Sequence, residues 1–278
     1  RALWLDRNRI RPHRHARRLG LPMTPSLASL LPAETWVYAL VFARIGSMIA
    51  TMPVFGETSV PVRARLVLAL ALTLVMAPVS GIAMDGPPGP GKLAVLLIGE
   101  VLIGLAIGMA TRFVMAAVHV AGNVIAAQLG LSMAMSSDPA QNGGQGAIVG
   151  NFLSLLALTL IVVTDLHHLL IGAMKNSYVM FPVGGAVSTG DLAQWAIQLM
   201  AAMFALAMQM AAPFLVFALV LQFTAGIVSR MMPQVQIFFI TVPISVLGGF
   251  VLLMFTLSAM MMAFLKAFGE TVGTVAGG

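Results

Sequence analysis

The chain has 278 residues, of which 59% are hydrophobic and only 9% are charged, whereas an ordinary soluble domain carries about 25% charged residues. This composition excludes a soluble enzyme or binding module. The absence of cysteine excludes disulfides, thiolate catalysis and cysteine-ligated metal centres. Because apolar runs long enough to cross a bilayer recur along most of the chain, we predict an all-α, polytopic membrane protein.

The net charge of +6 belongs to one end of the chain. Residues 1–22 contain seven arginines and one aspartate, whereas basic and acidic residues balance from Met23 onward. Residues 1–22 lack the apolar core of a signal peptide, so we interpret Met23 as the true start and the preceding residues as an extension. A basic arm that lies on anionic lipid is the alternative. The neutral body gives no indication of a nucleic-acid partner.

Two apolar runs open the body of the protein. Residues 36–55 are about one bilayer long and contain a single charge, Arg44, at their middle. Residues 66–84 carry no charge until the loop at 85–92, whose prolines and glycines cannot continue a helix. We expect one helix for each run.

A third apolar stretch extends from residue 93 to about residue 137 and is interrupted only by Glu100 and Arg112. It is too long for one membrane crossing, so we expect a helix, a bend near Arg112 and a second helix. The segment 136–146 is rich in glycine and polar residues and breaks the pattern. The next span begins near residue 147 and continues to about residue 175.

The last two apolar runs cover residues 192–229 and 231–265, and each is longer than the hydrocarbon core requires. Pro213 lies inside the first and Pro243 inside the second. We therefore predict a hairpin of two long, kinked helices. Its tip comprises Arg230, Met231, Met232, Pro233 and Gln234.

Polar and ionisable groups inside apolar spans are costly, so they are candidates for function. The alternative to a chemical role is that opposite charges pair between helices and fix the packing, for example Arg44 or Arg112 with Glu100. We favour this structural interpretation, because so few groups do not form a proton relay. The candidates are Arg44, Glu100, Arg112, His119, Gln128, Asp165, His167 and His168.

Asp165, His167 and His168 form a possible metal-ligating set. Adjacent residues of a helix point about 100° apart, so we expect the two imidazoles not to face one ion. We predict instead that one histidine reaches the membrane interface and the other bonds a neighbouring helix. No metal or other cofactor is expected.

Other local patterns carry little chemistry. Gly104 and Gly108 form a GxxxG pattern that lets two helix backbones approach closely. The Gly-x-Ser pattern at Gly130 and Ser132 is only a weak match to an intramembrane protease. Neither a zinc-binding HExxH motif nor a phosphate-binding glycine loop with lysine is present. The sequence predicts a protein that is not an enzyme.

Four ordered segments resemble the FliR family of flagellar type III export-gate proteins. They are residues 42–78, 121–139, 165–171 with the downstream 181–185, and 229–249. The resemblance implies a channel subunit of the bacterial inner membrane, in the flagellar basal body, that assembles with FliP and FliQ and contacts FlhB. Its cargo would be exported, unfolded flagellar proteins. The alternatives are an injectisome homologue and a secondary transporter of a small solute.

The resemblance also implies an internal division and a plug. Residues 23–191 would correspond to a FliP-like half and residues 192–278 to a FliQ-like hairpin. The segment 130–146 would project into the channel and help to close it. Ser136 is too small to seal the channel, so Met135 would supply the bulky apolar side chain instead. The implied plug residues are Gly130, Leu131, Ser132, Met133, Met135, Ser136, Asp138 and Pro139.

Overall fold

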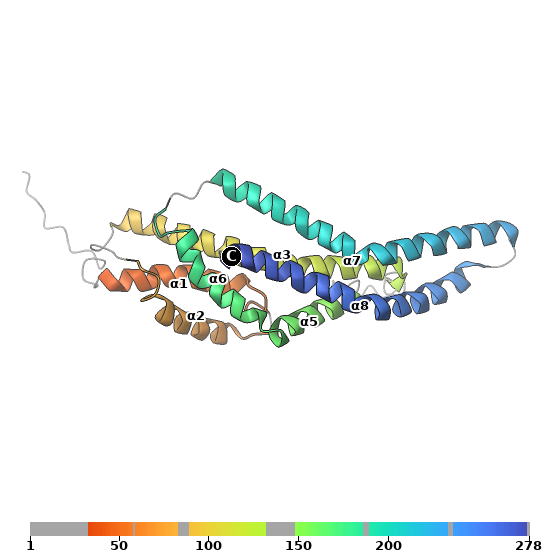
Figure 1. The fold of residues 1–278 in the computed structure, drawn as a ribbon, viewed down its shortest axis with the longest axis horizontal. Coiled ribbons are helices and arrows are strands. Elements are labelled where there is room, and N and C mark those ends of the chain that lie inside the picture. The colour runs from red at the N-terminus through yellow and green to blue at the C-terminus, as the bar shows by residue number, and fades with distance from the viewer. Residues whose placement is uncertain are drawn as a thin grey trace, which may run out of the picture.

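A computed structural model describes residues 33–57, 59–82, 89–131, 148–185, 189–232 and 236–276, and all regular structure within these ranges is helical. The predicted all-α fold class is therefore confirmed. Figure 1 shows an elongated bundle whose helices run mostly along the long axis. The helices are α1 (Ala33–Thr51), α2 (Val62–Met76), α3 (Pro90–Gln128), α5 (Ile148–Val163), α6 (Leu166–Met180), α7 (Thr189–Met231) and α8 (Phe238–Ala276).

Helix α3 is the spine of the bundle and packs against α1, α5, α7 and α8. Pro90 occupies its first turn, where a missing N–H costs nothing. Its buried apolar residues recur every three or four positions, as one face of a helix requires, and include Ile103, Ile107, Ala110 and Val114. Its 39 residues span about 59 Å.

The predicted bend near Arg112 is wrong, since α3 continues without interruption from Pro90 to Gln128. Arg112 is exposed on the surface of this helix. A single charged side chain removes no backbone hydrogen bond, unlike proline, so it does not end a helix. The stretch that we expected to form two helices is therefore one long rod over these residues.

Glycines let α3 approach its neighbours closely. A side chain at Gly104 would collide with the Arg44 carbonyl and the Ser47 hydroxyl of α1. Gly122 faces Gly150 of α5 with no room for a Cβ atom on either residue. The GxxxG pattern therefore serves a contact within the chain, between α1 and α3.

The structure also divides the span that we expected to continue from residue 147 to residue 175. Helix α5 ends at Val163, α6 begins at Leu166, and the two axes differ by 75°. Asp165 between them has a φ of +59°, a left-handed conformation that aspartate tolerates better than most residues. We call residues 164–168 the elbow.

Helices α7 and α8 form the predicted long hairpin. Each contains an internal proline, Pro213 in α7 and Pro243 in α8. Figure 1 shows α7 bent near its middle and the distal halves of both helices extending beyond the rest of the bundle. Proline removes one backbone hydrogen bond and so bends a helix that packing keeps intact.

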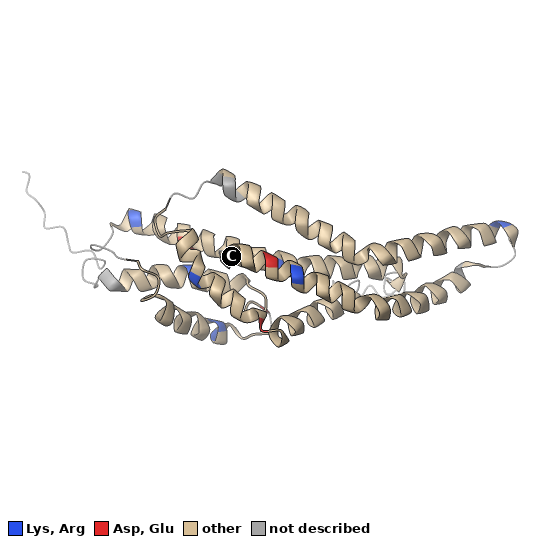
Figure 2. Cartoon of the chain, in the orientation of Figure 1, with Lys and Arg blue, Asp and Glu red and all other residues tan. Residues whose placement is uncertain are grey.

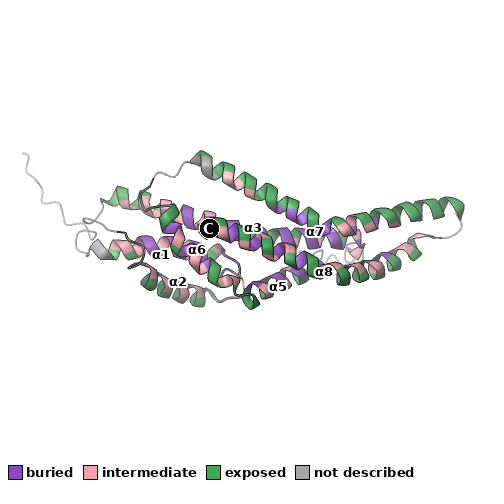
Figure 3. Ribbon diagram, in the orientation of Figure 1, coloured by how far each residue is buried: buried purple, intermediate pink, exposed green. Residues whose placement is uncertain are grey.

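The surface is apolar over most of its length. Figure 2 shows few charged residues on the long helices, and Figure 3 shows exposed residues along the whole distal hairpin. Helices α3, α7 and α8 are long and apolar enough to cross a membrane, and the bent pair α5–α6 is a fourth candidate among the described residues. Helix α1 is apolar but shorter.

Candidate functional site

The polar centre of the bundle is an ion pair between α1 and α3. Arg44 Nε donates to Glu100 Oε2 at 2.5 Å, and both side chains are almost fully buried. A buried charge is strongly unfavourable unless it is paired and hydrogen-bonded. Of the two arginines that the sequence offered as partners for Glu100, the structure therefore brings Arg44 to the carboxylate and leaves Arg112 exposed.

The same guanidinium also holds the end of α6. Arg44 Nη1 donates to the Ser177 carbonyl at 2.9 Å and Nη2 to the Phe181 carbonyl at 2.8 Å. The Ser177 carbonyl also accepts the Phe181 N–H at 2.9 Å. The C-terminus of a helix carries partial negative charge, so a cation stabilises it. The Tyr178 ring lies 4.3 Å from Arg44 Cζ. One side chain thus joins α1, α3 and α6, and we call this group the Arg44 clamp.

Two other candidates lie farther along α3. His119 is half-buried, and its ring and carbonyl border Gly150 at the crossing of α3 and α5. Gln128 is the last residue of α3 and is also half-buried. Neither contacts the Arg44 clamp through a described hydrogen bond, so the predicted polar residues do not form one site.

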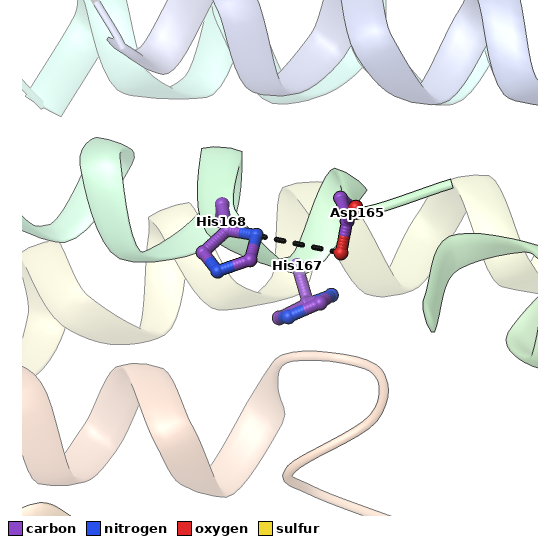
Figure 4. A group of neighbouring side chains, drawn as sticks. All are labelled: Asp165, His167 and His168. Atoms are coloured by element: carbon purple, nitrogen blue, oxygen red, sulfur yellow. Dashed lines mark ion pairs between the residues drawn. The ribbon is translucent and has the colours of Figure 1, made fainter. Parts of the chain in front are cut away.

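Asp165, His167 and His168 come together at the elbow, as Figure 4 shows. The His168 Nδ1 atom lies 3.7 Å from Asp165 Oδ1, and the two imidazole centroids are 4.2 Å apart. The two rings lie near each other although the residues are adjacent in the helix, and whether both can face one ion stays a prediction. The Nδ1 atom of His167 is buried without a hydrogen-bond partner in the described structure.

The end of α3 is fixed where the implied plug begins. The Ser245 hydroxyl of α8 lies 3.1 Å from the Leu129 carbonyl and 2.8 Å from the Val242 carbonyl of its own helix, so its one hydrogen is shared between them. The buried Leu129 side chain packs against Gly249. Gly130 follows with a φ of +73°, which glycine adopts without strain. Leu131 is half-buried. The other implied plug residues, Ser132, Met133, Met135, Ser136, Asp138 and Pro139, lie outside the described residues.

The hairpin tip is exposed where the structure describes it. Arg230, Met231 and Met232 all lie at the surface, whereas Pro233 and Gln234 lie outside the described residues. Behind the tip, α7 and α8 border an open apolar pocket of about 550 Å³. Its walls include Phe217, Val220, Val228, Met232, Ile240 and Ile244.

Sequence reasoning missed the acceptors of the Arg44 clamp and the elbow. Ser177 and Phe181 act through backbone carbonyls, which every residue type has, so no side-chain pattern could reveal them. Asp165 gave a weak signal, because aspartate is one of the few residues that enter the left-handed region. The position of Asp165 directly after a long apolar run is the feature that could have indicated the break between α5 and α6.

Comparison with known proteins gives consistent matches along the chain. Residues 35–271 match the family described as bacterial export proteins, family 1. The flagellar biosynthetic protein FliR of Caulobacter vibrioides is 44% identical over 238 residues, which cover 85% of this chain and 94% of the relative. FliR of Bacillus subtilis is 30% identical over 90% of this chain and 95% of its own length. FliR of Escherichia coli is 31% identical over 78% of this chain and 84% of its own length.

Proposed function

The chain belongs to family 1 of the bacterial export proteins, and from that premise we propose that it forms a protein-conducting channel together with FliP and FliQ. It is a membrane protein of the flagellar export apparatus and not an enzyme. In the proposal, unfolded flagellar subunits pass through a pore that this chain lines in part. The energy for their passage comes from other components of the apparatus.

The length of the apolar helices carries this proposal. Helices α7 and α8 contain 43 and 39 residues and so extend for about 65 and 59 Å, roughly twice the 30 Å hydrocarbon core. Large apolar side chains are exposed along both, among them Phe204, Phe223 and Phe255. A bilayer covers only part of such a surface, and contiguous exposed apolar area outside it indicates protein partners. Subunits with similarly long helices are suitable partners.

A second part of the proposal concerns closure of the channel. Segment 130–146 starts at an anchored point, since Leu129 is bonded to Ser245 and packed against Gly249. The chain is again helical from Ile148, where α5 packs against α3. We propose that the segment between these two points blocks the pore and moves aside for cargo. We propose that Met133 and Met135 supply the deformable apolar seal.

The proposal extends to place and partners. We propose the bacterial inner membrane, in the flagellar basal body, as the location, with FlhB as a neighbour. Residues 23–191 and 192–278 would be the FliP-like and FliQ-like parts. The relatives reported above carry flagellar names, which favours the flagellar apparatus over an injectisome.

Pro213 and Pro243 do not provide the broken helices on which the solute-transporter alternative depends. Such transporters bind their substrate at broken helices near the middle of the membrane, whereas α7 and α8 remain continuous through Pro213 and Pro243. The pocket between their distal halves is lined almost entirely by apolar side chains. A polar solute would find few hydrogen-bonding groups there.

Co-purification tests the proposed function. The tagged chain is extracted from its native host in a mild detergent, and the proteins that accompany it are identified by mass spectrometry. We expect FliP and FliQ in a stable complex, and an unrelated inner-membrane protein with the same tag serves as the control. Recovery of this chain alone, folded and monodisperse, would overturn the proposal.

A further inference from the structure

The elbow between α5 and α6 brings together three potential ligands that the export role does not use. Asp165, His167 and His168 each offer one ligand atom, and all three atoms lie within 4.8 Å of one another. These residues follow directly after a 75° change in helix direction. The left-handed backbone of Asp165 is a conformation that most residues avoid, and it places the carboxylate beside the first turn of α6 (Figure 4).

The three ligand atoms lie within 4.8 Å of one another, which is a wider spacing than around a bound metal ion. Zinc binds histidine nitrogen and carboxylate oxygen at about 2.0–2.2 Å, so tetrahedral ligand atoms lie roughly 3.3 Å apart. The Asp165 Oδ1 and His168 Nδ1 atoms are already 3.7 Å apart. Both of these side chains are more than two-thirds exposed, so small rotations can close the remaining distance without disturbing the packing of the bundle.

His167 adds a second argument. Its Nδ1 atom is buried and has no hydrogen-bond partner in the described structure, and an unsatisfied buried nitrogen is unfavourable. Ligation through this nitrogen would satisfy it. The His167 and His168 rings lie 4.2 Å apart with a tilt of 36°, so the exposed His168 ring must rotate to aim one nitrogen of each ring at the same ion.

We propose that Asp165, His167 and His168 bind one divalent transition-metal ion of the zinc type. Two imidazoles and one carboxylate match the ligand preference of this class, and water completes the tetrahedron. The ion would join the residue between the two helices to the first turn of α6 and so hold the 75° angle of the elbow. This site is independent of the proposed export function.

Metal titration of the purified full-length chain in detergent tests this inference. His13 and His15, which are the histidines of the extension, are changed to glutamine in every sample, and the tag contains no histidine. We expect one equivalent of Zn²⁺ to bind and to raise the midpoint of thermal unfolding. With Co²⁺ as the spectroscopic probe, we expect the absorption bands of a tetrahedral site with nitrogen and oxygen ligands.

Single substitutions then identify the ligands. Asp165→Asn keeps a residue that tolerates the left-handed backbone but removes the charge, and His167→Gln and His168→Gln each remove an imidazole. Changing a residue that merely orients a metal ligand weakens metal affinity roughly 10–100-fold. We expect each of these substitutions to weaken Zn²⁺ binding by at least as much. Glu270→Gln, which removes an exposed carboxylate on α8, is the control and should bind Zn²⁺ like the parent.

The opposite results are equally clear. If the parent shows no saturable Zn²⁺ binding, or if all three variants bind as tightly as the parent, the cluster is only an ion pair between Asp165 and His168. A lower unfolding midpoint of the variants in the absence of Zn²⁺ would indicate a structural role of these residues. The deciding quantity is therefore the rise in unfolding midpoint that Zn²⁺ causes in the parent and in each variant. Co-purification of FliP and FliQ would be unaffected by either outcome.

Discussion

The Arg44 guanidinium of α1 and the Glu100 carboxylate of α3 meet at 2.5 Å, with side-chain exposures of 0% and 2%. Their charges therefore depend on each other, because neither reaches water. Arg44 also bonds the last carbonyls of α6, so the pair stabilises the junction of three helices. This arrangement makes the Arg44 clamp the part of the bundle most sensitive to loss of a charge.

The first prediction concerns this pair. Glu100→Gln keeps the shape of the side chain but leaves the Arg44 cation buried without a counter-charge, which we expect to cost roughly 3–5 kcal/mol in the free energy of unfolding. The measurement is equilibrium unfolding in mixed detergent micelles. Glu270→Gln is the matched control, since its partner Lys266 lies 3.9 Å away in an exposed pair, and it should cost at most about 0.5 kcal/mol. Equal effects of both substitutions would contradict the assigned role of the clamp.

The second prediction compares two glycines of α3. Gly104→Ala places a methyl group against the Arg44 carbonyl and Ser47 of α1, whereas Gly99 has open space around it. We expect Gly104→Ala to destabilise the protein by about 1–3 kcal/mol through overpacking. Gly99→Ala should be neutral or stabilising by up to about 1 kcal/mol because alanine favours the helix. Unfolding of the two variants side by side tests this, and a stable Gly104→Ala protein would rule out the close contact.

The third prediction concerns the anchor of segment 130–146. Gly249→Ala collides with the buried Leu129 side chain, whereas Gly269→Ala, also on α8, meets open space. We expect Gly249→Ala to displace the start of the segment at a cost of about 1–3 kcal/mol. In cells, the variant should leak ions through an assembled channel, while Gly269→Ala stays tight. Tight closure in both variants would show that the anchor does not control the segment.

The fourth prediction concerns the proposed seal. Met133→Ala combined with Met135→Ala removes two flexible apolar side chains, so we expect a larger ion leak with an unchanged complex of FliP, FliQ and this chain. Conductance of the reconstituted complex measures the leak. Met208→Ala, which shortens an exposed methionine on α7, is the control. If the double variant conducts no more than this control, the methionines of the segment are not the seal.

The sequence predicted those helices whose ends coincide with a change from apolar to polar residues. The hairpin of α7 and α8 follows from two uncharged runs separated by Arg230 and Pro233, because charge and proline are unfavourable inside an apolar helix pair. The early end of α2 at Met76 was not predicted, since the apolar run continues to residue 84, and Ala77, the residue before Pro78, itself keeps helical φ and ψ angles of −56° and −46°.

Other features depend on tertiary structure and could not be predicted. Arg112 interrupts the apolar pattern but leaves the helix intact, because an arginine at a helix surface loses no backbone bond. The partners of Arg44 at the end of α6 are carbonyls that lie more than 130 positions away in the sequence. The meeting of His167 and His168 depends on side-chain torsions, about which helical periodicity carries no information.

The uninterrupted length of α3 has a mechanical consequence. Glu100 in the Arg44 clamp and Leu129 at the start of segment 130–146 belong to one rod without a proline or a break, and they lie about 43 Å apart along it. A rod without a hinge transmits a push or a twist almost undiminished. A displacement of α1 or α6 at one end would therefore move Leu129 at the other end, and in the proposed channel the start of segment 130–146 would move with it.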